Sequence, residues 1–197
     1  MFVSAMVADT TRRFNMCNCG RSMEVERLKN KNGNTVVISY DSDLPSPREW
    51  VNLGTFITWQ RRYHSPDKNP FESPNDFKEY IQEEHPDSLI LPVYKYEHSG
   101  VAYSTSPFSC PWDSGQVGYI YVTKEEIIKE YGSYSEETLE KAKERLEGEV
   151  SVYSSWANGD IFRYEILDNE GEEIDGGCGG FYGSDHEISG LAESANL

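Results

Sequence analysis

The segment Ser104–Ile120, STSPFSCPWDSGQVGYI, gathers a thiol, several hydroxyls and a carboxylate in one short stretch. Cys110 or Ser114 would serve as a nucleophile there, with Asp113 as the acid that orients a base. The base would be His98, because a nucleophile needs a proton acceptor held close to it. No G-x-S-x-G elbow accompanies these residues, so the pattern raises nucleophilic catalysis without requiring it.

The same segment is also compatible with two roles that involve no catalysis. Ser and Thr hydroxyls commonly satisfy backbone groups in loops, and Phe108 and Trp112 would then anchor the loop against a sheet. Alternatively, this loop and its neighbours form a binding surface. Structural, binding and catalytic roles are all compatible with the sequence of this loop.

A pair of carboxylates, Asp41 and Asp43, raises a second kind of chemistry. Paired acids can hold a divalent metal for phosphodiester hydrolysis, although nuclease sites usually add further acids and a lysine or histidine. No spacing ties the pair to other residues, and a polar turn after a strand accounts for it equally. The catalytic alternative is therefore a nucleic-acid-processing enzyme, acting for example on a guide RNA. Its candidate residues are Asp41, Asp43, His98 and Asp113, with Glu49 and His64 also available.

The cysteines give little support for a metal centre. Cys17 and Cys19 form a C-x-C pair with no second matching pair, which is a weak zinc signal. Four thiols in 197 residues favour reduced cysteines in a cytosolic setting. We predict no structural metal and no cofactor.

Charge is strongly acidic and unevenly spread. The chain carries 34 acids against 18 Lys and Arg, a net charge of -16, and residues 123–197 hold 19 of the acids but 6 of the bases. A direct, nonspecific nucleic-acid binder normally presents clustered Lys and Arg to phosphates. We therefore expect no direct nonspecific DNA binding, and we expect the C-terminal half to repel DNA.

A basic and aromatic cluster in the middle of the chain is the exception to this acidic field. Arg61, Arg62, Tyr63 and His64 are consecutive. Arginine and aromatic rings stack on bases and clamp phosphates, but the same side chains also pair with carboxylates of their own chain. Both roles are open for this cluster.

The periodicity of the chain predicts an α+β fold. Residues 24–29 and 35–40 alternate like a hairpin around Asn32-Gly33, and further strands are expected near residues 55–60, 88–98, 100–106, 116–122 and 160–166. Helices are expected after three capping residues, Ser73, Thr123 and Ser135, with a short helix near the C-terminus. The expected fold is a single compact α+β domain over residues 23–197, with an antiparallel or mixed sheet and three to four helices on one side. Residues 1–22 do not resemble a signal peptide, no segment approaches a membrane span, and we expect these residues to form a flexible extension.

The longest predicted helix combines a buried stripe with a dense acidic surface. Leu139, Ala142, Leu146, Val150 and Tyr153 recur at spacings of three and four and would face a core. The rest of the helix is rich in carboxylates, which form either a solvated face or a mimic of nucleic-acid phosphates. These carboxylates are Glu136, Glu137, Glu140, Glu144 and Glu147.

Three blocks of the sequence resemble a family of small proteins from bacteriophages and prophages of Gram-positive hosts. The blocks begin at Ser42, His98 and Gly176, and they read SDLPSPREWVNLGTFITWQRRYHSPD, HSGVAYSTSPFSCPWDSGQVGYIYVTKEEI and GGCGGFYGSDHEISGL. The family supplies no catalytic residues. The resemblance implies a genomic role like that of anti-CRISPR or antirestriction proteins, which inhibit host defence.

The sequence thus leads to one main hypothesis, a phage-derived inhibitor of a bacterial defence nuclease that works in the host cytoplasm. The partner would be a nucleic-acid-binding protein such as a Cas nuclease or restriction enzyme, bound by direct contact and without a membrane. The alternatives are the nucleic-acid-processing enzyme above and a phage structural or replication accessory protein. The partner-binding candidates are Glu136, Glu137, Glu140, Glu144, Glu147, Arg61, Arg62 and Trp112.

Overall fold

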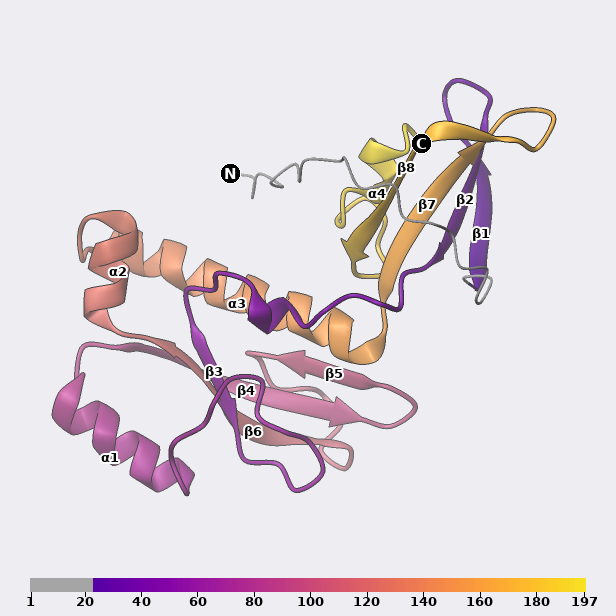
Figure 1. The fold of residues 1–197 in the computed structure, drawn as a ribbon. Helices are drawn as coiled ribbons and strands as arrows, with labels where there is room; N and C mark the ends of the chain where they lie inside the picture. The colour runs from indigo at the N-terminus through magenta and orange to yellow at the C-terminus, as the bar shows by residue number, and fades with distance from the viewer. Residues whose placement is uncertain (1–22) are drawn as a thin grey trace.

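The computed structural model describes residues 23–197, which form two four-stranded antiparallel sheets and four α-helices (Figure 1). Sheet A has the order β1-β2-β7-β8 and sheet B the order β3-β6-β4-β5. The α+β class and the antiparallel pairing are confirmed. The expected extension at residues 1–22, with Cys17 and Cys19, lies outside the described residues.

Sheet A is built from the two ends of the described chain. The first hairpin turns at residues 31–33, where Gly33 adopts a φ of 84°, and β2 then pairs with β7, more than 120 residues away in the chain. Val36, Ile38, Phe162 and Tyr164 bury one face of this sheet under Leu191 of the short helix α4. The strands are β1 (Glu24–Lys29), β2 (Thr35–Tyr40), β7 (Ile161–Leu167) and β8 (Glu173–Tyr182), and α4 spans Leu191–Ser194.

Sheet B is built from the middle of the chain, and helices cover both of its faces. Phe56 and Ile120 belong to the core under α3, whereas Ile57 and Tyr119, their neighbours in the strands, pack with Phe77 of α1. The helices therefore do not all lie on one side, because alternate residues of these strands are apolar on both faces. The strands are β3 (Thr55–Thr58), β4 (Leu89–Glu97), β5 (Val101–Ser104) and β6 (Ser114–Val122); the helices are α1 (Pro74–Glu84), α2 (Lys124–Tyr131) and α3 (Glu136–Asn158).

The predicted caps begin and end these helices. Ser73, Thr123 and Ser135 each accept a hydrogen bond from the third residue of the helix that follows, and each forms a reciprocal capping box. Gly132, with a φ of 79°, ends α2. None of the helices in residues 23–197 is long and apolar enough to cross a bilayer.

Helix α3 connects the two sheets (Figure 1). Its buried stripe packs on sheet B, and its C-terminal end leads directly into β7 of sheet A. Of the predicted stripe, Ala142, Leu146, Val150 and Tyr153 are buried and Leu139 is partly buried. The short helix η1 (Pro47–Glu49) lies against α3 on the segment that runs from β2 to β3.

Candidate functional site

The structure places the predicted carboxylates of α3 on one side of the helix. At 100° per residue, Glu136, Glu137, Glu140, Glu144 and Glu147 fall within an arc of roughly 100° that flanks the buried stripe. The first four are exposed and Glu147 is partly exposed. We call these five residues the acidic arc.

Two of the five carboxylates are paired within the helix. Lys141 donates a hydrogen bond to Glu137 at 2.6 Å, which lowers the pKa of that carboxyl and keeps it ionised. Lys143 lies 3.3 Å from Glu140. Glu136, Glu144 and Glu147 form no ion pair with any residue in the range 23–197. The acidic arc therefore keeps a net negative charge.

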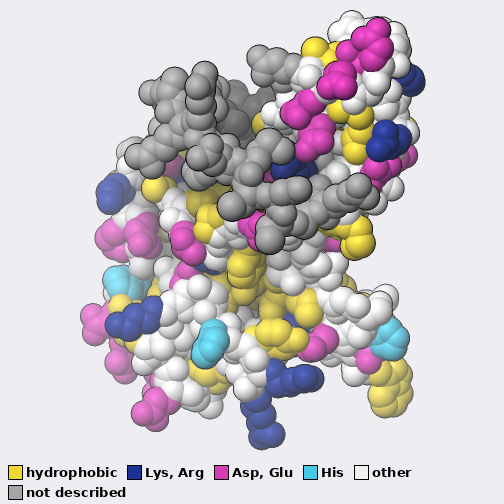
Figure 2. All heavy atoms as spheres, turned by 45° about the vertical axis from the view of Figure 1, so that its right-hand side comes forward, with side chains coloured by type: hydrophobic (Ala, Val, Ile, Leu, Met, Phe, Trp, Pro, Cys, Tyr) yellow, Lys and Arg dark blue, Asp and Glu magenta, His cyan; other side chains and the backbone are white. Residues whose placement is uncertain are grey.

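Acidic side chains also gather away from α3. Figure 2 shows several Asp and Glu side chains on the upper lobe, which is sheet A, with Lys and Arg side chains among them. The tight turn between β7 and β8 carries Asp168, Glu170, Glu172 and Glu173. This second acidic group provides a natural comparison for the acidic arc.

The predicted catalytic residues of the Ser104–Ile120 loop do come together, but not in the order of a catalytic triad. Asp113 Oδ2 lies 3.4 Å from His98 Nδ1 and accepts a hydrogen bond from Cys110 Sγ at 3.5 Å. The carboxylate thus sits between the thiol and the imidazole, whereas a triad needs the imidazole in the middle. Ser114 donates its hydroxyl to the carbonyl of Cys110 rather than to His98. The hydroxyl and thiol contacts support a structural role for these residues of the loop.

The two aromatic residues of the loop behave differently from each other. Phe108 packs on Tyr96 of β4, with ring centroids 5.7 Å apart, as expected for an anchor. The expectation that Trp112 also anchors the loop against a sheet is wrong, because its side chain is 92% exposed.

The basic and aromatic cluster lies beside this loop. Tyr63 donates a hydrogen bond to Glu97 at 2.6 Å, and Lys95 Nζ lies 3.9 Å from the centroid of the Tyr63 ring. Glu97 in turn accepts a hydrogen bond from Lys95, and hydrogen bonding from Lys95 and Tyr63 lowers the pKa of its carboxyl. Arg61 and Arg62 remain exposed.

The expected metal pair at Asp41 and Asp43 is not assembled. Asp41 Oδ2 accepts a hydrogen bond from the backbone of Gly180 at 3.0 Å and so joins β8 to the end of β2. Asp43 is exposed, and both residues follow a strand of sheet A, whereas His98 and Asp113 lie at the end of sheet B. Within residues 23–174 and 177–197, no three His, Cys, Asp or Glu side chains are grouped to hold a metal ion.

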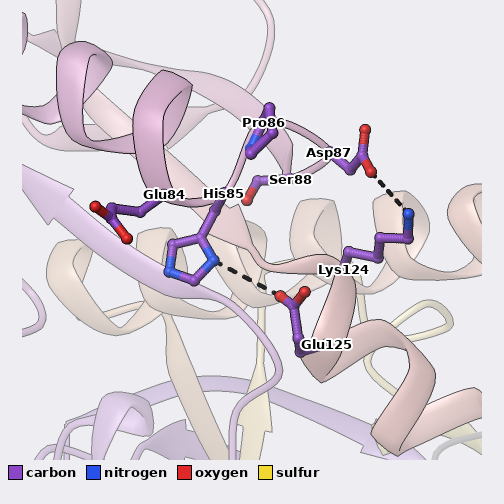
Figure 3. Close-up of a pocket in the computed structure, with 7 residues that line it drawn as sticks. All are labelled: Glu84, His85, Pro86, Asp87, Ser88, Lys124 and Glu125. Carbon is purple, nitrogen blue, oxygen red and sulfur yellow. Dashed lines mark hydrogen bonds and ion pairs between the residues drawn. The ribbon is translucent and has the colours of Figure 1, made fainter.

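A shallow pocket lies where the end of α1 meets the start of α2 (Figure 3). His85 Nδ1 lies 3.6 Å from Glu125 and Lys124 Nζ lies 2.7 Å from Asp87, so an imidazole–carboxylate contact and an ion pair join the walls of the pocket. These contacts hold the 85–88 turn against α2. The pocket is lined by Glu84, His85, Pro86, Asp87, Ser88, Lys124 and Glu125.

A buried ion-pair cluster at Arg48 is not predicted by the sequence. The guanidinium forms a bidentate pair with Asp67, at 3.0 and 2.6 Å, and a further hydrogen bond to Glu149 at 3.0 Å. Burial alone would lower the pKa of Arg48, but hydrogen bonds and attraction from the two carboxylates outweigh burial and raise it. The available signal is the position of Glu149 between Leu146 and Tyr153, which places a carboxylate in the buried stripe of α3.

No known family model, curated protein or solved structure matches this chain.

Proposed function

We propose that this protein inhibits a bacterial defence nuclease of the CRISPR or restriction type by presenting the acidic arc of α3 to the basic groove that holds nucleic acid. The sequence blocks that resemble phage proteins give the biological setting. The observation that carries the proposal is the alignment of five carboxylates on one side of a helix held rigidly by its packing on sheet B.

The spacing of these carboxylates suits a phosphate mimic. Residues 136–147 rise roughly 16 Å along the helix axis at 1.5 Å per residue, which gives about one carboxylate per 4 Å. A single DNA strand carries one phosphate per about 3.4 Å of axis. The carboxylates are spaced about as closely as the phosphates, and the arc keeps a net negative charge although Lys141 and Lys143 pair with two of them, so a groove selected for a phosphate backbone would attract this helix.

The shape of the helix also favours binding over solvation alone. Its buried side is fixed by Ala142, Leu146 and Val150, all at or below 1% exposure, so the carboxylates are presented on a rigid support. A rigid array loses little conformational entropy when it binds. Mobile acidic tails lack this advantage.

The test is inhibition of purified Cas nucleases and restriction enzymes from Gram-positive hosts, measured as DNA cleavage against protein concentration over a range of salt from about 50 to 300 mM. We expect stoichiometric inhibition that weakens as salt screens the charges. The variant Glu136→Lys, Glu140→Lys, Glu144→Lys and Glu147→Lys should lose inhibition.

The control variant reverses the same kind of charge elsewhere. Glu170→Lys, Glu172→Lys and Glu173→Lys, in the β7–β8 turn, should retain inhibition although the net charge also becomes less negative. Equal loss in both variants would assign the effect to net charge. Inhibition that resists salt and survives reversal of the arc would reject the mimic mechanism.

A further inference from the structure

Three segments far apart in the sequence meet at one end of sheet B. The hydroxyl of Tyr63 donates to the side chain of Glu97, and the backbone N–H of Glu97 donates to the carbonyl of Asp113 at 2.9 Å. Trp112 precedes Asp113, so the arginine segment, the end of β4 and the exposed tryptophan are joined by direct contacts. We call Arg61, Arg62, Tyr63 and Trp112 the loop surface.

The two arginines of the loop surface lack the partners that other arginines of this chain have. Both are exposed, and neither forms an ion pair in the described part of the chain. Glu97, whose charge acts on Arg62, is already hydrogen-bonded to Lys95 and Tyr63. Two adjacent guanidiniums without an ion pair are free to contact an anionic ligand. The arginines that do pair with carboxylates are Arg27, Arg48, Arg145 and Arg163.

Trp112 is presented on a loop that is held in place. Ser114 and Cys110 are hydrogen-bonded across the loop, Asp113 contacts both Cys110 and His98, and Phe108 packs on the sheet. The indole is 92% exposed. A large flat ring held on a fixed loop and left free of packing is suited to stacking on a ligand.

We propose that the loop surface binds a short single strand of RNA or DNA, with a base stacked on Trp112 and phosphates contacted by Arg61 and Arg62. Aromatic rings beside arginines are the combination that single-strand-binding proteins use, because every base has a face that stacks and every linkage carries a negative charge. A duplex keeps its bases stacked inside and offers none to Trp112. The proposal is independent of the acidic arc.

The acidic arc does not prevent this binding at physiological salt. Asn158, near the end of α3, accepts a hydrogen bond from Val101 beside the loop surface, and it lies 11 residues, or roughly 16 Å, beyond Glu147 along the axis. The Debye length is about 8 Å at 0.15 M ionic strength. The field of the arc is therefore largely screened at the loop surface, whereas Arg61 and Arg62 act at contact distance.

The experiment measures fluorescence anisotropy of labelled dT12 and U12 strands titrated with the full chain between about 50 and 200 mM salt. Two phosphate contacts predict a slope of about −1.4 in log K against log salt, so affinity should fall about sevenfold across this range. Trp112→Ala should weaken binding about fivefold or more at unchanged slope. The double variant Arg61→Ala with Arg62→Ala should bring the slope close to zero.

Matched controls are available in the same chain. Trp50→Ala removes another exposed tryptophan, and Lys129→Ala removes an exposed cation on α2; both should bind as the unmodified protein does. The substituted side chains are exposed, and circular dichroism verifies that each variant is folded. Comparing the affinities for dT12 and U12 shows whether DNA or RNA is the preferred ligand.

Several results would overturn the proposal. One is that neither dT12 nor U12 binds at the lowest salt. Another is that the Trp112 and arginine variants bind the strands as tightly as the unmodified protein does. A third is that a duplex of the same length binds more tightly than the single strands. A poly-glutamate peptide that competes as well as dT12 would assign the surface to an acidic protein instead. Failure of the nuclease-inhibition assay leaves this result unaffected, because neither strand binding nor its variants involve α3.

Discussion

Arg48 Nη1 and Glu149 Oε2 lie 3.0 Å apart, although 101 residues separate them in the chain. Glu149 also accepts backbone hydrogen bonds from Leu53 and Gly54, and Asp67 accepts one from Phe56. The guanidinium therefore holds α3, the edge of β3 and the long connection before β3 together. This buried cluster fixes the helix that carries the acidic arc onto sheet B.

Removing the guanidinium should be strongly destabilising. Arg48→Ala leaves Asp67 without its counterion and Glu149 with only Arg145, 3.7 Å away, and breaking a buried pair in this way costs about 3–5 kcal/mol of the free energy of unfolding. Urea denaturation followed by circular dichroism measures the loss. Arg27→Ala is the control, since its pair with Glu24 is exposed on both sides and should contribute little to stability. Similar losses in the two variants would contradict a structural role for the Arg48 cluster.

The local elements of this fold follow from the sequence, and the long-range cluster does not. The hairpin at Gly33, the three capping boxes and the end of α2 at Gly132 each depend on residues within a few positions of one another. Arg48 and Glu149 meet because α3 crosses the connection before β3, and no local pattern reports that crossing. The sequence does not predict the division into two sheets for the same reason, because the pairing of β2 with β7 joins segments from both ends of the described chain.

The candidate site shows the same contrast. Helical periodicity alone predicts the acidic arc, because it places the five carboxylates on one side of α3. Helical periodicity says nothing about Trp112, which lies in a loop. We expected Trp112 to pack against a sheet, and this expectation is wrong because the side chain is exposed. The loop that carries Trp112 is joined to His98 through the contacts of Asp113 with His98 and Cys110, and spacing in the sequence does not encode those contacts.

Two glycines should respond in opposite directions to alanine. A Cβ at Gly118 would collide with the carbonyl oxygen of Ile57 in the neighbouring strand, so Gly118→Ala should cost about 3 kcal/mol of stability through overpacking. A Cβ at Gly148 on α3 meets nothing within 4 Å, and Gly148→Ala should stabilise the helix by about 0.5–1 kcal/mol. Thermal unfolding of the two variants tests both. A neutral Gly118 variant would show that β3 and β6 approach less closely than described.

Stability should fall in alkaline solution because of Tyr153. Burial raises the pKa of its phenol from 10.0 to about 12, so the folded state holds the proton over a pH range in which the unfolded state releases it. This contribution is fully present below pH 10 and is lost as pH rises through about 12; by pH 11 the loss is about 1.4 kcal/mol. The test measures the free energy of unfolding of the protein and of Tyr153→Phe from about pH 8 to pH 11. The difference between the two isolates the contribution of Tyr153. A difference that does not change with pH would refute the raised pKa.

The loop between β5 and β6, residues 105–113, should prove to be a surface rather than a part of the core. Asp113→Ala with Ser114→Ala removes the side-chain bonds to Cys110 and the contact with His98, each worth about 0.5–1.5 kcal/mol at most, while the backbone bond from Glu97 to Asp113 remains. We expect a folded protein in which chymotrypsin cleaves after Phe108 and Trp112 faster, with weaker binding of dT12. Ser109→Ala is the control, because Ser109 is exposed and its hydroxyl makes no hydrogen bond within residues 23–197. If the double variant instead unfolds, with a loss as large as that of Arg48→Ala, the loop stabilises the core and its exposed tryptophan is incidental to function.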